Sequence, residues 1–250
     1  MEIITFGGGE RLRAAALALP KYLKDREKYS DISRVIVLPI PSTRDGKFIT
    51  GTGISLDSML SEVSGGTLVA GWGIPLEISR AIESRRGRVY DASEDGEFVL
   101  ENAELTAIGA LGRILTECRT APCGLSVGVV GFGRIGKLLV KYLLFFGARV
   151  RVYTTSPEVR RELSALGVET RDTYLERDFS SLDLIVNTAP ARVISEGEAA
   201  LLPPHVRIME LASGNGLEGV PRVTKYPSLP EVMYPITAGE IYAQYIALGM

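Results

Sequence analysis

The sequence feature that most constrains the fold is a glycine-rich turn between an apolar run and a helical pattern. Residues 127–130 predict a buried strand, and Gly131, Gly133 and Gly136 then give the spacing G-x-G-x-x-G. In a strand–turn–helix unit, the first glycine permits a tight turn and the second lets the backbone approach a pyrophosphate. The third lets the helix pack closely on the strand. We interpret the turn as a dinucleotide-binding site, against the alternative of a glycine-rich turn that binds nothing.

The residues after the turn continue the pattern of such a unit. Apolar side chains recur at helical spacing until Gly147, and residues 148–153 predict the next strand. A nucleotide bound at this turn is expected to contact six consecutive residues: Gly131, Phe132, Gly133, Arg134, Ile135 and Gly136.

Length and composition limit the class of protein. A chain of 250 residues is long enough for one large or two small domains. With 46% hydrophobic residues, 23% charged residues and a net charge of −2, the chain predicts neither disorder nor a nucleic-acid or membrane surface. No apolar run approaches the roughly 18 residues of a membrane helix, and no basic leader precedes an apolar segment. We therefore expect a cytoplasmic protein whose partner is a small molecule.

Metal and disulfide chemistry are not expected. Cys118 and Cys123 are the only cysteines, and no second pair accompanies them. Their spacing is not C-x-x-C, so buried or idle thiols are the interpretation and no metal site is assigned.

Strand and helix patterns alternate along the chain, which predicts parallel sheets. Strands are expected at residues 3–6, 34–40, 67–71, 88–91, 183–187, 206–211 and 222–226. Helices are expected at 12–19 (interrupted near Pro20), 76–84, 98–118, 157–166 and 196–201, and from Ala238 onward. The expected fold is α/β, with two Rossmann-like doubly wound parallel-sheet domains joined by a long helix and the cofactor domain C-terminal.

The expected domain boundaries follow from these patterns. Residues 1–100 form a substrate domain, 101–122 a linking helix and 123–235 an NAD(P)-binding Rossmann domain. Residues 236–250 form a C-terminal helix that packs back toward the first domain.

Ligands of open parallel sheets bind beyond the carboxyl ends of the strands, so the loops that follow strands are the candidate binding loops. They comprise residues 7–9, 41–44, 71–73, 187–190 and 212–216. The cofactor is expected to contact Asn187, Thr188, Ala189 and Pro190. The substrate is expected to contact Ser42, Thr43, Arg44, Ser213 and Asn215. Arg44 is the best candidate for holding a carboxylate, and a solvated loop arginine is the alternative.

The end of the second strand of the cofactor domain bears on which nucleotide is bound. An acidic residue there would hold the ribose diol of NAD, but this chain has Thr154, Thr155 and Ser156. Hydroxyl groups suit a 2′-phosphate, and Arg160 or Arg161 can add positive charge. We therefore expect NADP as the cofactor, with NAD second. Hydroxyls that only cap the helix before Pro157 are the alternative.

Catalytic side chains are not assigned. His205 is the only histidine and precedes a predicted strand, so we expect it at the surface. Without a histidine for acid–base work, reduction of a keto acid is disfavoured. Glu210 ends a predicted buried strand, where it is either a general base with a raised pKa or a structural group satisfied by local amides. The structural role is favoured.

From residue 34 onward, the chain resembles the A subunits of dipicolinate synthase, a two-domain Rossmann-type family of spore-forming bacteria. The resemblance rests on blocks in matching order at residues 35–43, 102–110, 127–136, 183–190, 211–213 and 229–239. It implies NADP-linked oxidation, during sporulation, of a dihydropyridine dicarboxylate or its hydrated precursor to pyridine-2,6-dicarboxylate. It also implies a flavoprotein-like second subunit. The chain departs from the family pattern at Glu210, at residues 214–217 and at Ile236, which leaves the identity of the acid open.

That chemistry agrees with the lack of a histidine at a binding loop. Formation of an aromatic ring drives loss of a hydride and a proton from the substrate. Accurate placement of C4 of the nicotinamide therefore matters more than a strong protein base. Two other classes stay open, a nucleotide-binding subunit that does not catalyse and an enzyme similar to 2-hydroxy-acid dehydrogenases. A homo-oligomer is also left open.

Overall fold

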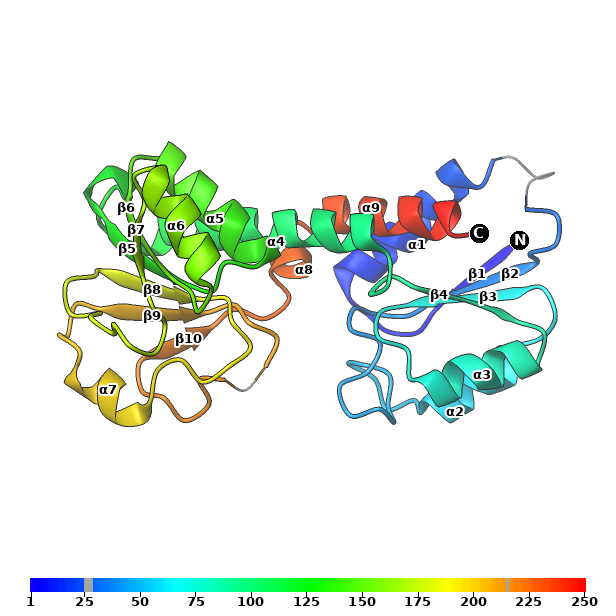
Figure 1. Cartoon of the computed structure of the whole chain (residues 1–250). Helices are drawn as coiled ribbons and strands as arrows, with labels where there is room; N and C mark the ends of the chain where they lie inside the picture. Colours follow the sequence, from blue (N-terminus) through cyan, green and yellow to red (C-terminus); the bar gives the residue numbers. More distant parts are fainter. Residues whose placement is uncertain (25–28, 215) are drawn as a thin grey trace. The chain divides into compact units, whose positions relative to one another are not determined.

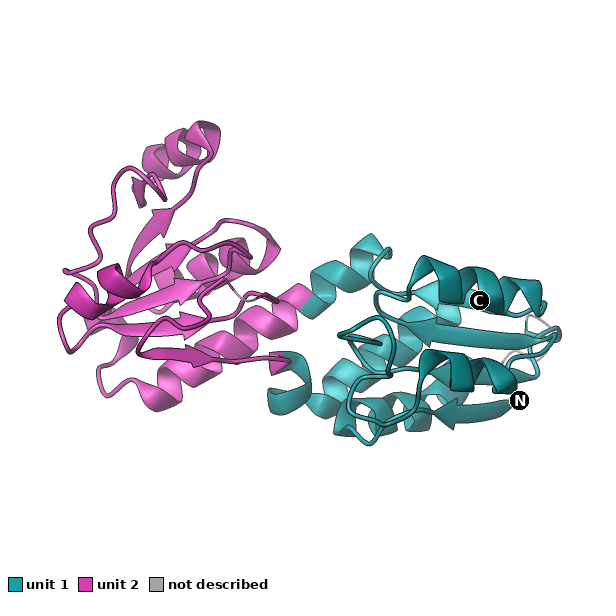
Figure 2. Ribbon diagram, turned by 90° about the horizontal axis from the view of Figure 1, so that it is seen from below, with its two compact units in different colours: residues 1–102, 230–250 teal, residues 103–229 magenta. Residues whose placement is uncertain are grey.

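The computed structural model describes residues 1–24, 29–214 and 216–250, and in it the chain divides into two compact units (Figure 1). Unit 1 comprises residues 1–102 and 230–250, and unit 2 comprises residues 103–229 (Figure 2). The boundaries fall within two helices, α4 (Gly96–Glu117) and α8 (Leu229–Met233). Among the described residues, no helix is both long enough and apolar enough to cross a membrane.

Unit 1 is built on a four-stranded parallel sheet in the order β1-β2-β3-β4. The strands are β1 (Glu2–Thr5), β2 (Arg34–Val37), β3 (Thr67–Gly71) and β4 (Arg88–Asp91). All five residues of β3 are buried, as is usual for a central strand with both faces covered.

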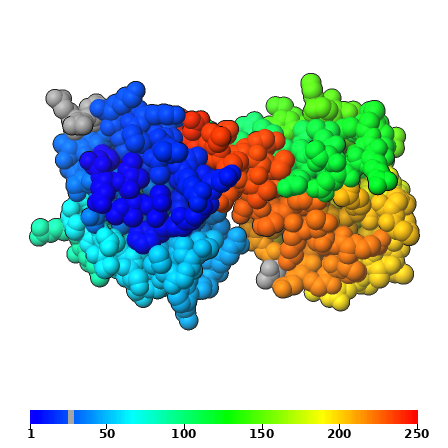
Figure 3. All heavy atoms as spheres, turned by 180° about the vertical axis from the view of Figure 1, so that it is seen from behind, coloured from blue at the N-terminus to red at the C-terminus, as the bar shows by residue number. Residues whose placement is uncertain are grey.

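Two groups of helices cover the two faces of this sheet. The core on one face joins β2 and β3 to α1 (Glu10–Tyr22), to Phe98 of α4 and to α9 (Pro235–Leu248). The core on the other face contains α2 (Leu56–Met59), the short 3-10 helix η1 (Leu60–Glu62) and α3 (Leu76–Ser84). Helix α9, near the C-terminus of the chain, therefore lies beside α1, near its N-terminus (Figure 3).

Unit 2 is built on a six-stranded parallel sheet in the order β10-β9-β8-β5-β6-β7. The strands are β5 (Ser126–Val130), β6 (Arg149–Tyr153), β7 (Glu169–Arg171), β8 (Leu184–Asn187), β9 (Arg207–Glu210) and β10 (Val223–Lys225). The chain moves outward from β5 to β7 on one side, and from β8 to β10 on the other. The strand order therefore reverses between β5 and β8, which is where ligands bind in doubly wound sheets.

The helices of unit 2 connect these strands. They are the second part of α4, the short 3-10 helix η2 (Pro122–Gly124), α5 (Arg134–Phe145), α6 (Pro157–Ala165) and α7 (Glu196–Leu201). Helices α5 and α6 lie on one face of the sheet and α7 on the other (Figure 1). The Tyr142 hydroxyl of α5 donates to Glu104 of α4 at 2.8 Å, which places these two helices side by side.

The predicted fold class is confirmed, and the local differences have physical causes. Helix α1 continues through Pro20 to Tyr22, so the expected interruption is wrong. Pro20 removes one backbone hydrogen bond and crowds the preceding turn, but it lies in the last turn and Leu19 beside it is fully buried, which offsets that cost. Helix α9 begins at Pro235 rather than Ala238, because proline is well suited to the first helical position.

Candidate functional site

The glycine turn of unit 2 joins β5 to α5 at the point where the strand order reverses. Gly131 has φ of +91°, and its N–H donates to the Tyr153 carbonyl at the end of β6 at 2.9 Å. A Cβ at this position would lie 2.7 Å from the Thr188 hydroxyl. Both the backbone angle and the available space therefore require glycine here.

The other two glycines differ in what surrounds them. A Cβ at Gly136 would collide with the Gly131 carbonyl oxygen, so this glycine permits the close packing of α5 on the turn. A Cβ at Gly133 would meet no heavy atom within 4 Å. No side chain caps the N-terminus of α5, where Gly133 is the N-cap. The open side of the turn and the uncapped amides of 134–136 suit a phosphate group.

The loop after β8 is tied to the glycine turn. The Thr188 hydroxyl donates to the Val130 carbonyl at 3.0 Å. Asn187 is fully buried, and its side-chain oxygen accepts the Ala189 N–H at 3.1 Å. Thr188 and Ala189 are half-buried and Pro190 is exposed. In this loop, the Asn187 side chain sets the backbone, and the next three residues remain accessible beside the turn.

Glu210 at the end of β9 is satisfied by local amides. Its carboxylate accepts hydrogen bonds from the Asn187 side chain at 3.1 and 3.0 Å and from the Ala212 N–H at 2.8 Å. Burial raises the pKa of Glu210, and the Asn187 and Ala212 hydrogen bonds and the charge of Lys225 oppose that rise. These contacts match the structural role favoured from the sequence.

The loop after β6 uses some of its polar groups internally. Ser156 is the N-cap of α6 and accepts the Val159 N–H at 3.2 Å, as in the capping alternative. Thr154 is buried, and its hydroxyl accepts the Ser156 N–H at 3.3 Å. Thr155 is exposed.

The two arginines of α6 differ in their contacts. Arg160 donates to the Thr154 carbonyl at 2.6 Å and forms an ion pair with Asp172 at 2.9 Å. Arg161 is exposed and lies 3.5 Å from Glu158, which is exposed as well. Arg161 is therefore the guanidinium of this helix that a ligand can reach most readily.

The proposed substrate residues of unit 1 lie after β2. Ser42 is fully buried. Its hydroxyl accepts a hydrogen bond from the backbone N–H of Trp72 at 2.7 Å, and its backbone N–H donates to the Trp72 carbonyl at 2.9 Å. Thr43 donates to Asp45 at 3.1 Å within a loop that an isolated antiparallel bridge between Thr43 and Ile49 closes. Arg44 is exposed and makes no hydrogen bond or ion pair with a described residue. Arg44 is thus the member of this group with donors to spare.

The remaining predicted residues lie in unit 2. Ser213 is exposed, two residues beyond the buried Leu211, and Asn215 lies outside the described residues. His205 is exposed before β9, as predicted. Within the described ranges, no group of three or more His, Cys, Asp or Glu side chains could hold a metal ion.

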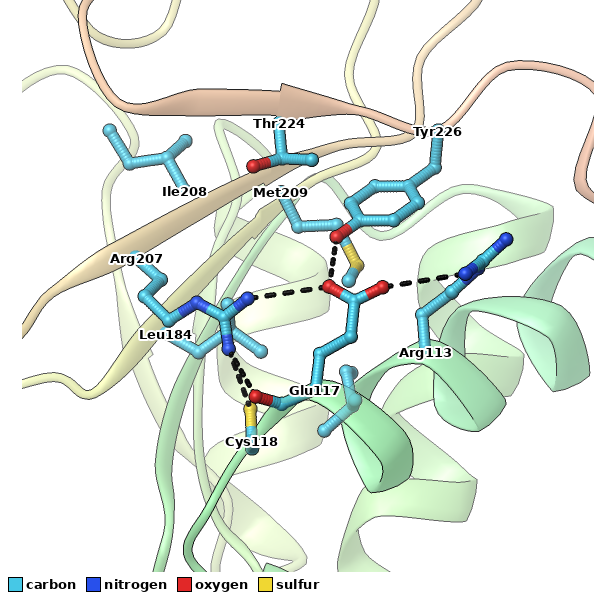
Figure 4. A pocket seen from close by; sticks show the side chains of 10 residues that line it. Arg113, Glu117, Cys118, Leu184, Arg207, Ile208, Met209, Thr224 and Tyr226 are labelled. Atoms are coloured by element: carbon cyan, nitrogen blue, oxygen red, sulfur yellow. Dashed lines mark hydrogen bonds and ion pairs between the residues drawn. The ribbon is translucent and has the colours of Figure 1, made fainter.

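A second polar cluster of unit 2 surrounds Glu117 at the end of α4 (Figure 4). Its carboxylate meets Arg113 at 3.6 Å, Arg207 at 3.3 Å and the Tyr226 hydroxyl. Cys118 lies beside Arg207 as a free thiol, and burial raises its pKa. Because the Glu117 carboxylate forms ion pairs with both arginines of the cluster, we interpret the cluster as structural.

Sequence reasoning missed Arg11, a buried cation of unit 1. Arg11 occupies the first turn of α1 and is only 5% exposed. The signal was present, because Arg11 shares a helical stripe with Ala15 and Leu19, which are buried against the sheet. An arginine on the apolar face of a helix is unusual enough to single out.

The fold and the glycine turn define the class of unit 2. Residues 116–218 match the family model of the NAD-binding domain of D-isomer-specific 2-hydroxyacid dehydrogenases. That range includes β5, the glycine turn and α5, together with β6 to β9. The chain therefore carries an NAD-binding domain of the dehydrogenase type, which supports a nicotinamide cofactor.

Parts of the chain are similar in sequence to curated proteins. The dipicolinate synthase A subunit of Bacillus subtilis (strain 168) is 26% identical over 133 residues, which cover 50% of this chain and 44% of that protein. The glyoxylate reductase of Thermococcus litoralis is 33% identical over 93 residues, which cover 36% of this chain and 28% of that enzyme. The matched regions thus span less than half the length of these curated relatives.

Solved structures extend the likeness over the whole chain. The dipicolinate synthase A subunit from Bacillus halodurans has a TM-score of 0.76 and 19% identity, covering 99% of this chain and 97% of that one. The corresponding polypeptide of dipicolinate synthase from Bacillus subtilis has the same TM-score and identity and covers 99% of this chain and 95% of that one. At such identities the likeness shows the fold. The resemblance to dipicolinate synthase A subunits that the sequence predicts is confirmed by the curated relative and by these structures.

Proposed function

We propose that this chain is an NADP-dependent oxidoreductase of the kind that the dipicolinate synthase A subunits represent. Its substrate is a dihydropyridine dicarboxylate, dihydrodipicolinate or its hydrated precursor, and its product is dipicolinate formed during sporulation. The observation that carries the proposal is the open glycine turn at the strand-order reversal of unit 2, in a chain whose fold is that of the dipicolinate synthase A subunits. The proposal includes a cytoplasmic location and a flavoprotein-like second subunit.

The residues of unit 2 fit a dinucleotide. Gly133 leaves one side of the turn open, and the uncapped amides of α5 face the phosphates. A bound nicotinamide cofactor supplies the hydride acceptor. At the end of β6, residues 154–156 include no carboxylate, and the exposed Thr155 and Arg161 suit a 2′-phosphate, so we favour NADP over NAD.

The oxidation itself asks little acid–base work of the protein. A hydride and a proton leave the dihydropyridine ring; the hydride reduces NADP⁺ and the proton passes to water. Because the product ring is aromatic, the reaction depends more on positioning the dihydropyridine ring against NADP⁺ than on the strength of a protein base. This agrees with the exposure of His205 before β9 and with a Glu210 carboxylate already engaged by Asn187 and Ala212.

The direct test is reduction of NADP⁺ by the purified chain supplied with dihydrodipicolinate. We expect absorbance to rise at the band of reduced nicotinamide, either with the chain alone or after addition of a flavoprotein-like second subunit. If the chain binds NADP⁺ but the absorbance does not rise in either setting, this proposal is wrong, and the chain is instead a nucleotide-binding subunit that does not catalyse.

A second candidate is a 2-hydroxy-acid dehydrogenase, which the match of residues 116–218 and the glyoxylate reductase relatives favour. Enzymes of that chemistry commonly use a histidine as acid–base group, and the single histidine of this chain is exposed before β9. Oxidation of NADH or NADPH by the purified chain with glyoxylate would support this candidate.

A further inference from the structure

The Arg11 side chain is a buried cation without a carboxylate partner. It is 5% exposed, and no acidic oxygen of a described residue lies within the 4.0 Å that defines an ion pair. Burial lowers the pKa of the Arg11 guanidinium to about 10, and electrostatic interactions with Tyr242 and Glu231 counter this only in part. The guanidinium nevertheless stays charged at neutral pH. Folding therefore encloses a positive charge that is not neutralised by direct contact, which is a costly arrangement.

Most donors of this guanidinium are unused. Nη2 donates to the Asn102 side-chain oxygen at 3.1 Å, and that acceptor is uncharged. Nε is enclosed without an acceptor, and no described residue accepts a hydrogen bond from Nη1. Of the Arg11 nitrogens, Nε alone is both fully enclosed and without a partner in the described part of the chain. Nη1 also lacks a partner there but is not fully enclosed, so it is the nitrogen that an incoming group can meet.

Aromatic rings hold the guanidinium in place. Its Cζ atom lies 5.8 Å from the centre of the Phe98 ring and 5.9 Å from that of Tyr242. The Tyr242 hydroxyl is itself anchored on the Leu38 carbonyl, just beyond β2, at 3.3 Å. A fixed, weakly hydrated arginine of this kind is well suited to bidentate binding of a carboxylate.

Arg11 lies near the carboxyl end of β1, at the edge where parallel sheets in general bind ligands. Arg11 follows the 7–9 loop, which leaves the carboxyl end of β1, and no side chain caps α1, whose N-cap is Gly9. Glu231 lies against Gly9 and is the acidic side chain that acts on Arg11 from a distance. Its carboxylate sits at the positive end of α1, which accounts for its position without an ion pair to Arg11.

We propose that Arg11 binds a carboxylate group of the substrate, so that an acidic ligand completes the charge balance that the folded chain lacks. The inference rests on the proposed function for its choice of ligand, a pyridine dicarboxylate. It goes beyond that function in assigning the carboxylate contact to a buried residue of α1 rather than to the exposed Arg44.

The chain contains a built-in reporter for this site. Trp72 is the single tryptophan of the sequence, and its ring lies 6.0 Å from Phe98, the ring that Arg11 faces. Titration of the full chain with pyridine-2,6-dicarboxylate, without any nucleotide, should therefore change Trp72 fluorescence in a saturable way. Pyridine, which lacks the carboxylates, should not produce this change.

Two variants of the same helix separate binding from folding. Arg11→Met should weaken dicarboxylate binding by roughly tenfold or more, because a charge-assisted contact is lost. The unfolding midpoint should stay the same or rise, since an apolar side chain of similar length replaces an unpaired charge. Arg13→Met is the matched control, because Arg13 is exposed two residues along α1 and should leave the affinity unchanged.

Should Arg11→Met fail to fold, the side-chain NMR signals of the wild-type chain decide. The Arg11 Nε–H signal, assigned by its loss in Arg11→Lys, should shift on addition of the dicarboxylate but not on addition of NADP⁺. An unmoved signal at saturation overturns the inference, as does an Arg11→Met variant that binds as tightly as the wild type. A chain that binds the dicarboxylate through Arg11 but does not reduce NADP⁺ loses the proposed oxidation only.

Discussion

The side-chain amide of Asn187 donates to both carboxylate oxygens of Glu210, over 3.1 and 3.0 Å, at neighbouring positions of two parallel strands. Both side chains are buried. The same two residues also hold the backbone that follows them, because Asn187 accepts the Ala189 N–H and Glu210 accepts the Ala212 N–H. A single buried polar pair therefore sets two loops at the carboxyl edge of the sheet of unit 2.

This pair predicts a pH dependence of stability. Burial raises the pKa of Glu210 in the folded chain above that in the unfolded chain. The contribution of Glu210 to stability is thus fully present below the unfolded pKa, about 4.3, and is lost as the pH rises through the folded pKa. We expect the unfolding free energy of the wild type, measured with urea and compared with that of Glu210→Gln, to decrease as the pH rises through this range. Glu218→Gln, at an exposed position, is the control. A wild-type to Glu210→Gln difference that does not change with pH would contradict this expectation.

The glycine turn predicts that stability and nucleotide binding can be separated. Gly133→Ala adds a methyl group that meets no heavy atom, so it should change the unfolding free energy by less than about 1 kcal/mol. It should nevertheless weaken NADP⁺ binding, because the methyl group fills the open side of the turn. Gly136→Ala should instead destabilise the chain by about 1–3 kcal/mol, since its methyl group collides with the Gly131 carbonyl.

Urea unfolding and calorimetric titration with NADP⁺ check both changes. Gly197→Ala is a matched control, because Gly197 lies in α7 with no neighbour within 4 Å of its added Cβ, and it should alter neither binding nor packing. Undiminished NADP⁺ affinity in Gly133→Ala would mean that the nucleotide does not approach this side of the turn.

The Ser42–Trp72 pair predicts a role in stability for Ser42. Removal of the hydroxyl in Ser42→Ala leaves the backbone N–H of the half-buried Trp72 without its acceptor, at a cost of about 1–3 kcal/mol. Urea unfolding followed by Trp72 fluorescence measures this loss. Ser213→Ala, at an exposed position, should unfold at the wild-type urea concentration. A Ser42→Ala variant of wild-type stability would show that the loop after β2 does not depend on this contact.

The periodic elements of the fold were predictable from the sequence, and several of the shortest ones were not. The unit of β5, the glycine turn, α5 and β6 follows directly from its apolar pattern and glycine spacing. By contrast, β7 has three residues and α2 has four, and both were missed. Elements of that length carry almost no periodic signal and depend on tertiary contacts for their stability.

The candidate site was predictable in its location but not in its pairings. The loops at the carboxyl ends of the strands follow from topology, which is why the residues of 187–190 do lie beside the glycine turn. Whether a side chain is free depends on partners far along the chain. Arg160 is engaged by Asp172, 12 residues later, and the exposed Arg44 is not engaged at all by a described residue. Arg11 could have been singled out on its apolar helix face, but its missing counter-charge is visible only in three dimensions.

The contrast between the two arginines of α6 predicts how nucleotide preference can be changed. Arg161 is exposed and held only by the exposed Glu158, so it can turn toward a 2′-phosphate at little cost. Arg161→Gln should therefore weaken NADP⁺ binding by about three- to tenfold while NAD⁺ binding stays the same. Arg160→Gln should act on stability instead, because it leaves Asp172 without its ion pair.

Parallel titrations of the wild type and of these variants with NADP⁺ and NAD⁺ measure the preference, and raised salt should reduce the advantage of NADP⁺. Arg119→Gln provides a control for the loss of one positive charge, since Arg119 is exposed in unit 2 and makes no hydrogen bond or ion pair with a described residue. If the wild type bound NAD⁺ more tightly than NADP⁺, the hydroxyls after β6 would be capping groups alone. The cofactor assignment would then pass to NAD, while the glycine turn would keep its role, because the pyrophosphate is common to both nucleotides.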